Sequence, residues 1–213
     1  PDRWESIQAL AQMNSEEAID ALLVRFSYMT EPSITDQEEK NAAYEAVVEA
    51  GDVSIEPVKR FLRSTEAVAW ATKMLDALLS AEDSTTELLA FLETMDLEYE
   101  RDPERKLTLL ATLEERHDPR IVGAVKRFLG DVNETARFHA TTTIWAQPNA
   151  EDARADVLAA LAVEDSVRTR TRMLEGFAAR GWDVGEHAEK LKKQLPAGWA
   201  LDGKNVPRAP AKK

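Results

Sequence analysis

The chain has 213 residues, of which 44% are hydrophobic and 31% charged, with no cysteine and a formal net charge of −12. This composition is typical of a folded protein, and the missing cysteine excludes disulfides, thiolate metal sites and a cysteine nucleophile. The acidic balance argues against a general nucleic-acid-binding protein, and no apolar run reaches the roughly 18 residues that a membrane span needs.

Apolar residues recur at helical spacing along the chain, and Pro, Gly and Asn interrupt them at short intervals. The predicted helices cover 4–13, 15–28, 35–50, a short stretch from 57, 68–79, 84–95, 103–116, 119–130, 133–148, 151–163, 165–181 and 184–195. Thr35 and Glu38 predict a capping box for the third helix, and Gly51 is expected to end it in the left-handed conformation. No alternating strand pattern appears, so the predicted fold class is all-α.

A five-residue motif occurs twice, as Val58–Leu62 and Val125–Leu129, and the two copies start 67 residues apart. Two units of about 33 residues each fall in the range of solenoids built from helix pairs. The expected helices form six pairs, whose second helices carry matching positions at Phe26, Phe61, Phe91, Phe128, Ala160 and Gln194. One pair cannot bury its apolar face alone, so we expect the pairs to stack into one continuous domain over residues 1–195.

The end of the chain is rich in Gly, Pro and Lys, which predicts a flexible C-terminal tail over residues 196–213. Two apolar residues in this tail, Trp199 and Leu201, could fold back to cover the last helix pair.

Two stretches in the second half resemble the repeat consensus of HEAT-repeat proteins. They are Leu129-Gly130-Asp131 followed by Arg137 and Ala140, and Glu164-Asp165-Ser166-Val167-Arg168 followed by Leu174 and Gly181. Residues 34–62 and the end of the chain also resemble an uncharacterised group of bacterial HEAT-repeat proteins. The resemblance covers nearly the whole chain and implies a right-handed α-α superhelix, a solenoid of about six HEAT-like helix pairs. It also implies ladders between an Asp in the turn and an Arg in the next helix, although the first three pairs lack this pattern.

Few residues suggest chemistry. Glu114 and His117 have one Glu-x-x-His spacing, but a carboxylate-bridged metal centre needs two such motifs on facing helices, so we expect no metal and no cofactor. His139 lies near Arg137 and three threonines, yet a nucleophile and base also need a third, orienting group. We therefore expect a packed histidine, and a lyase or hydrolase using His139 and Arg137 remains an alternative.

Cations recur on the predicted second helices. We call them the cationic stripe: Arg25, Lys59, Arg60, Arg63, Lys126 and Arg127, continued by Arg154, Lys190, Lys192 and Lys193. In HEAT-like solenoids the second helices usually line the concave side, so the resemblance implies a basic inner face. The first six of these residues are predicted to bind a partner.

The predicted function is that of a non-enzymatic scaffold or adaptor in the cytoplasm of a bacterial cell. Its concave face would bind an acidic or extended protein segment through charge-assisted contacts. Two alternatives stay open: the stripe cations pair with neighbouring carboxylates or cover apolar surface with their stems, or the stripe binds nucleic acid. The partner's identity and the oligomeric state do not follow from the sequence.

Overall fold

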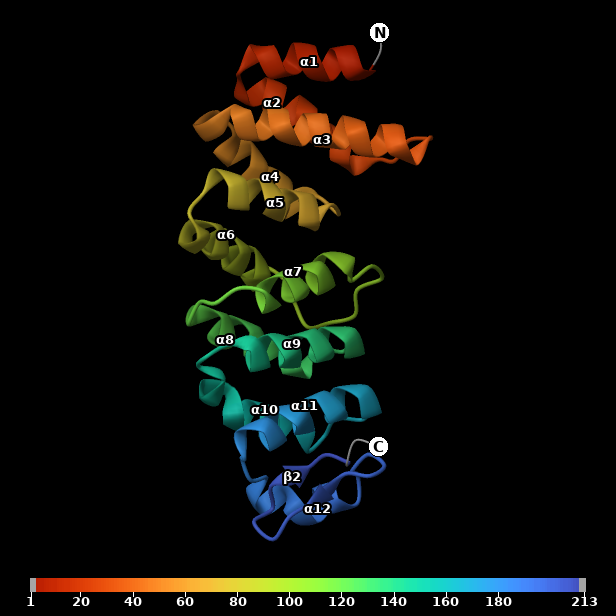
Figure 1. Cartoon of the computed structure of the whole chain (residues 1–213), viewed down its shortest axis with the longest axis vertical. Coiled ribbons are helices and arrows are strands. Elements are labelled where there is room, and N and C mark those ends of the chain that lie inside the picture. Colours follow the sequence, from red (N-terminus) through yellow and green to blue (C-terminus); the bar gives the residue numbers. More distant parts are fainter. Residues whose placement is uncertain (1–2, 211–213) are drawn as a thin grey trace. The chain divides into compact units, whose positions relative to one another are not determined.

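The computed structural model describes residues 3–210, which are all-helical apart from one two-stranded hairpin (Figure 1). Twelve α-helices lie in this range, which confirms the predicted all-α class. The chain divides into two compact units, Pro1–Met95 (unit 1) and Asp96–Lys213 (unit 2). The single domain over residues 1–195 and the superhelix both stay predictions.

Unit 1 contains three consecutive helix pairs, drawn red to olive in Figure 1. They are α1 (Arg3–Met13) with α2 (Glu16–Leu23), α3 (Ser33–Glu49) with α4 (Ile55–Ser64), and α5 (Val68–Leu78) with α6 (Ala81–Glu93). The 3-10 turn η1 (Val24–Ser27) follows α2, and the 3-10 turn η2 (Gly51–Ser54) precedes α4. α1 packs on α3 and α3 on α5, while α2 packs on α4 and α4 on α6. The first helices of the pairs thus form one layer and the second helices another.

Unit 2 contains the other three pairs. They are α7 (Glu104–Glu114) with α8 (Arg120–Val125), α9 (Glu134–Ala146) with α10 (Arg154–Leu161), and α11 (Val167–Arg180) with α12 (Ala188–Lys192). Three 3-10 turns accompany the second helices. η3 (Lys126–Gly130) follows α8, η4 (Ala150–Ala153) precedes α10, and η5 (Gly185–His187) precedes α12. The two strands are β1 (Ala200–Leu201) and β2 (Pro207–Arg208). α9 packs between α7 and α11, so the first helices again lie in succession.

The hairpin lies in the predicted tail, residues 196–213, of which residues 211–213 lie outside the described range. β1 and β2 pair in antiparallel fashion, β2 packs on α11, and Val206 just before it is buried. The amide of Val184 donates to the carbonyl of Asn205 at 3.0 Å, which attaches the hairpin to the last helix pair. The structure therefore has a hairpin at residues 200–208 within the predicted tail, and the flexibility of the tail stays a prediction.

Several helix ends follow local chemistry. Ser15 and Asn133 accept backbone hydrogen bonds as N-caps, and Gly51 has the expected left-handed φ of 65°. The predicted capping box of Thr35 and Glu38 is wrong, because α3 begins two residues earlier, at Ser33, and has no side-chain cap. Pro32 is the N-cap residue of α3 and has an extended backbone, with φ −74° and ψ 156°.

Among the helices of the described range, none combines the length and apolar character that a bilayer span requires.

Candidate functional site

The six residues predicted to bind a partner divide between the two units. Arg25, Lys59, Arg60 and Arg63 lie in unit 1, on η1 and α4, and Lys126 and Arg127 lie in unit 2, on η3. The structure places each of them in contacts within the chain, and these contacts decide what each could offer to a partner.

Arg25 is buried, with only 4% of its surface exposed. Its Nη2 atom lies 2.7 Å from a carboxylate oxygen of Asp36, and its Nε atom lies 2.8 Å from Glu39. Burial alone would lower the pKa of this guanidinium, but the hydrogen bonds with Asp36 and Glu39 outweigh it and the pKa is raised. This position leaves Arg25 no surface to offer to a partner.

Arg25 instead organises the loop that follows η1. Its Nη1 atom donates to the carbonyl of Tyr28 at 3.1 Å, and Nη2 donates to the hydroxyl of Thr30 at 3.2 Å. The Thr30 amide in turn donates to the Asp36 carboxylate at 2.9 Å. The loop therefore has a buried polar anchor, while Met29 within it is 81% exposed.

The stripe cations of α4 are paired with carboxylates. Lys59 lies 3.1 Å from Glu87, and Arg63 approaches the same carboxylate at 3.1 Å. Arg60 lies 3.0 Å from Asp20 and 3.2 Å from Glu16, and its hydrogen bond with Asp20 raises the pKa of the guanidinium. Arg60 and Arg63 both keep half of their side-chain surface exposed.

The two stripe cations of unit 2 also have neighbours. Lys126 lies 3.2 Å from Asp156, and the guanidinium of Arg127 lies 4.4 Å from the centre of the Phe128 ring. For these residues, the contacts match the alternative in which stripe cations pair with carboxylates or cover apolar surface.

The net charge is unevenly distributed along the chain. Residues 1–95 carry 19 acidic and 7 basic side chains, whereas residues 96–213 carry 20 of each. The whole formal charge of −12 therefore belongs to unit 1. The cations of α4 are a minority within a strongly acidic unit.

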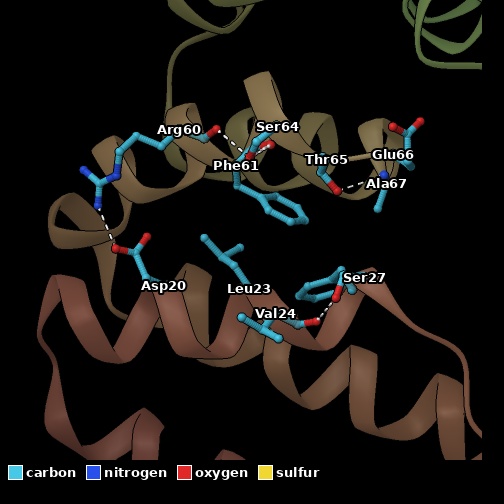
Figure 2. Close-up of a pocket in the computed structure, with 11 residues that line it drawn as sticks. Asp20, Leu23, Val24, Ser27, Arg60, Phe61, Ser64, Thr65, Glu66 and Ala67 are labelled. Carbon is cyan, nitrogen blue, oxygen red and sulfur yellow. Dashed lines mark hydrogen bonds and ion pairs between the residues drawn. The ribbon is translucent and has the colours of Figure 1, made fainter.

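Unit 1 has a half-open pocket of about 430 Å³ between α2 and α4, shown in Figure 2. We call it the α2–α4 pocket. Its walls are Asp20, Leu23, Val24, Phe26 and Ser27 from α2 and η1, and Arg60, Phe61, Ser64, Thr65, Glu66 and Ala67 from α4 and the loop after it. Its volume is within the range of sites that bind small molecules or peptide side chains.

The interior of the α2–α4 pocket is apolar and aromatic. Phe61 extends from α4 into the space above Leu23 and Val24 (Figure 2). Its ring centre lies 6.1 Å from that of Phe26, which lies 5.0 Å from Trp70 behind it. Val24 is 58% exposed, so apolar surface reaches the pocket mouth.

Charged and polar groups lie at the two ends of this pocket. At one end Arg60 is shared between Asp20 and Glu16, and at the other the exposed Glu66 forms no ion pair within residues 3–210. The wall hydroxyls of Ser27 and Ser64 donate to backbone carbonyls of their own helices. The pocket therefore offers an apolar centre with carboxylates at both ends.

Unit 2 has a more open hollow of about 790 Å³ across α7, α9 and α11. The guanidinium of Arg168 lies 3.8 Å from the centre of the Phe138 ring, and Arg172 donates to the Thr142 hydroxyl at 3.0 Å. Both arginines also pair with carboxylates, Arg168 with Glu134 and Arg172 with its helix neighbour Glu175. The two arginines of this hollow are thus engaged within the chain.

The candidate enzyme residues Arg137 and His139 have different surroundings. Arg137 is bound by Glu164 at 2.8 Å and by Asp165 at 3.1 Å, and the bond to Glu164 raises its pKa. Burial lowers the pKa of the half-buried His139, whose Nδ1 atom has no hydrogen-bond partner. An orienting carboxylate for the imidazole is missing among the described side chains. Nor do three or more potential metal ligands gather in residues 3–210, where Glu114 and His117 lie.

Comparison of the chain with protein-family models, curated proteins and solved structures finds no match. The HEAT-repeat assignment therefore stays a prediction.

The α2–α4 pocket does not follow from the sequence, although one feature of the sequence is related to it. Phe26 and Phe61 occupy matching positions on consecutive second helices, and in the structure both line the pocket with their ring centres 6.1 Å apart. The two ends of the pocket had no such signal, because Arg60 and Glu16 are 44 residues apart in sequence.

Proposed function

We propose that this protein is a non-enzymatic protein-interaction scaffold made of HEAT-like helix pairs, and that the α2–α4 pocket is its docking site for an extended partner segment. The observation that carries the proposal is the pocket itself, half open, with Phe26 and Phe61 at its centre. An aromatic pocket that receives one anchor side chain is the usual centre of a binding interface.

Three further features support this function. The succession of α1, α3 and α5 over α2, α4 and α6 is what stacked HEAT-like pairs require, and six such pairs would build the predicted right-handed superhelix. The charge of unit 1 disfavours nucleic acid as its ligand. The absence of cysteine suits a reducing compartment, which is consistent with the bacterial cytoplasm as the proposed location.

A rigid docking surface has a thermodynamic advantage for this role. The pocket walls come from packed helices, and the loop after η1 is held by the buried Arg25. Binding then requires little further ordering of the protein, so more of the contact energy appears as affinity.

Selection from a displayed random peptide library tests the proposal. Peptides enriched on the wild type should lose about tenfold or more in affinity when Ser64→Trp fills the pocket mouth. Ala90→Trp, at an exposed position of α6, is the matched control and should bind them as the wild type does. Circular dichroism and thermal unfolding establish that both variants fold.

The proposal fails if the library yields no enriched peptide, or if the enriched peptides bind Ser64→Trp as tightly as Ala90→Trp.

A further inference from the structure

We infer that the occupant of the α2–α4 pocket is a basic segment, in which an apolar anchor side chain is flanked by lysine or arginine. This inference rests on the proposed function and goes beyond it by naming the chemistry of the partner. It also reverses the sequence-based expectation of an acidic segment.

Both ends of the α2–α4 pocket carry carboxylates. Arg60 carries one positive charge and is shared between Asp20 and Glu16, so this end keeps an excess of negative charge. The exposed Glu66 adds a carboxylate at the other end. A segment with cations on both sides of its anchor would complement this arrangement.

The unit around the pocket is strongly acidic. With 19 acidic and 7 basic side chains, residues 1–95 would repel an acidic segment at long range and attract a basic one. Lys59 and Arg63 share Glu87, and Lys59 also lies 3.1 Å from Glu56, so two carboxylates balance these two cations beside the pocket.

The pocket centre suits an apolar anchor side chain from the partner. Leu23, Val24, Phe26 and Phe61 supply the apolar lining of the pocket. The hydroxyls of Ser27 and Ser64 already donate to backbone carbonyls, and that of Thr65 accepts from the Ala67 amide. A volume of about 430 Å³ accommodates one aromatic or aliphatic side chain together with the neighbouring backbone. Burial of an apolar side chain is therefore the main attraction, and the flanking cations set the orientation.

Arg60 gives the inference a sharp consequence. It occupies the two carboxylates that a cation of the partner would use, so it acts as an internal competitor for that cation. Removing its charge should strengthen binding of a basic segment and weaken binding of an acidic one. The sign of this single effect separates the two kinds of partner.

The test uses the peptides enriched from the random library, and the most enriched one is synthesised with a fluorescent label. We expect lysine or arginine beside an apolar anchor in the enriched set. Arg60→Gln should raise the affinity for the labelled peptide by about two- to fivefold, which corresponds to the energy of one exposed ion pair. Glu66→Gln should lower this affinity by a similar factor. Glu38→Gln, on the exposed surface of α3, is the control for a lost carboxylate and should change the affinity less.

Failure of this inference is distinguishable from failure of the proposed function. Enriched peptides that are blocked by Ser64→Trp, but are acidic or uncharged or bind Arg60→Gln more weakly, leave the docking site in place and overturn the basic partner. A set that ignores Ser64→Trp, or no enrichment at all, overturns both.

Discussion

Lys106 Nζ lies 2.8 Å from the Asp131 carboxylate, and both side chains are almost completely buried, with 1% and 0% of their surface exposed. The pattern recurs one helix pair later, where Arg137 of α9 lies 2.8 Å from Glu164 in the loop before α11. Each cationic side chain extends from the first helix of one pair to the loop that precedes the first helix of the next pair. These links connect consecutive pairs within unit 2.

The links differ in part from the ladder that the HEAT resemblance implies. The Arg137 guanidinium donates to the main-chain carbonyl of Asp131 at 3.0 Å, while the Asp131 carboxylate is taken by Lys106. Asp131 also accepts the amide of Asn133, the residue that caps α9. One buried carboxylate therefore joins α7 to the start of α9.

The first prediction concerns this buried pair. Lys106→Met should destabilise the protein by about 3–5 kcal/mol, because it leaves the Asp131 carboxylate buried without its cation. The double variant Lys106→Met with Asp131→Asn should recover most of that loss, since the amide oxygen can still accept from Asn133. Urea unfolding followed by circular dichroism measures both.

The matched control is Lys192→Met, which removes an exposed ion pair with Glu189 and should cost less than about 1 kcal/mol. Equal losses for Lys106→Met and Lys192→Met would contradict the importance assigned to burial.

The second prediction concerns the contact between α9 and α11. A Cβ atom placed on Gly176 would clash with Cε2 of the Trp145 indole. The indole is held by its Nε1 hydrogen bond to the Arg172 carbonyl at 3.0 Å and cannot easily move away. Alanine in place of glycine within a helix would normally stabilise by about 1 kcal/mol, but overpacking typically costs about 1–3 kcal/mol.

We therefore expect Gly176→Ala to lower the thermal midpoint of unfolding. Gly123→Ala in α8 is the control, because an added Cβ there meets no atom within 4 Å and should be neutral or stabilising. A Gly176→Ala protein at least as stable as the wild type would show that α9 and α11 do not approach this closely.

Helical periodicity was sufficient to predict the all-α class and most of the helices, because apolar spacing and caps such as Asn133 act within a few residues. It was not sufficient for the second helices. Val58–Leu62 lies within α4, whereas the identical residues Val125–Leu129 pass from α8 into a 3-10 turn. The same five residues take two conformations, so the surrounding packing decides between them.

The candidate site was less predictable than the fold, for a reason that Arg60 illustrates. Its charge is evident from the sequence, but its carboxylate partners Glu16 and Asp20 lie 44 and 40 residues earlier. Arg25 appeared equivalent to Arg60 because both lie on second helices. Only the tertiary packing of α3 against η1 shows that Arg25 is buried against Asp36.

The third prediction concerns acid stability in unit 1. The hydrogen bond from Arg3, with that from Arg25, holds the pKa of Glu39 below its ordinary value of 4.5, against the opposing effect of burial. Because the folded-state pKa is the lower one, the unfolded chain binds protons first as the pH falls. The stabilisation is therefore present above about pH 4.5 and is lost as the pH falls through the folded-state pKa of Glu39.

Glu39→Gln should accordingly reduce the slope of unfolding free energy against pH on the acid side. Urea unfolding at a series of pH values measures this slope. Glu38→Gln, its exposed neighbour without an ion pair in the described range, should leave the slope close to that of the wild type. A slope reduced equally by both substitutions would count against the buried Arg25 network.

The last prediction concerns His139. Burial lowers its pKa from 6.5, and Arg168 acts in the same direction, while Glu114 and Glu134 oppose them. The fold therefore favours the neutral imidazole, and protonation in the unfolded chain comes first as the pH falls.

The stability associated with the neutral ring is present above about pH 6.5 and is lost as the pH falls through the folded-state pKa. His139→Gln should remove this part of the pH dependence below about pH 6.5, and His117→Gln, at an exposed position after α7, is its control. An NMR titration of the wild type gives the direct value, and a His139 pKa above 6.5 would contradict the dominant effect of burial on this ring.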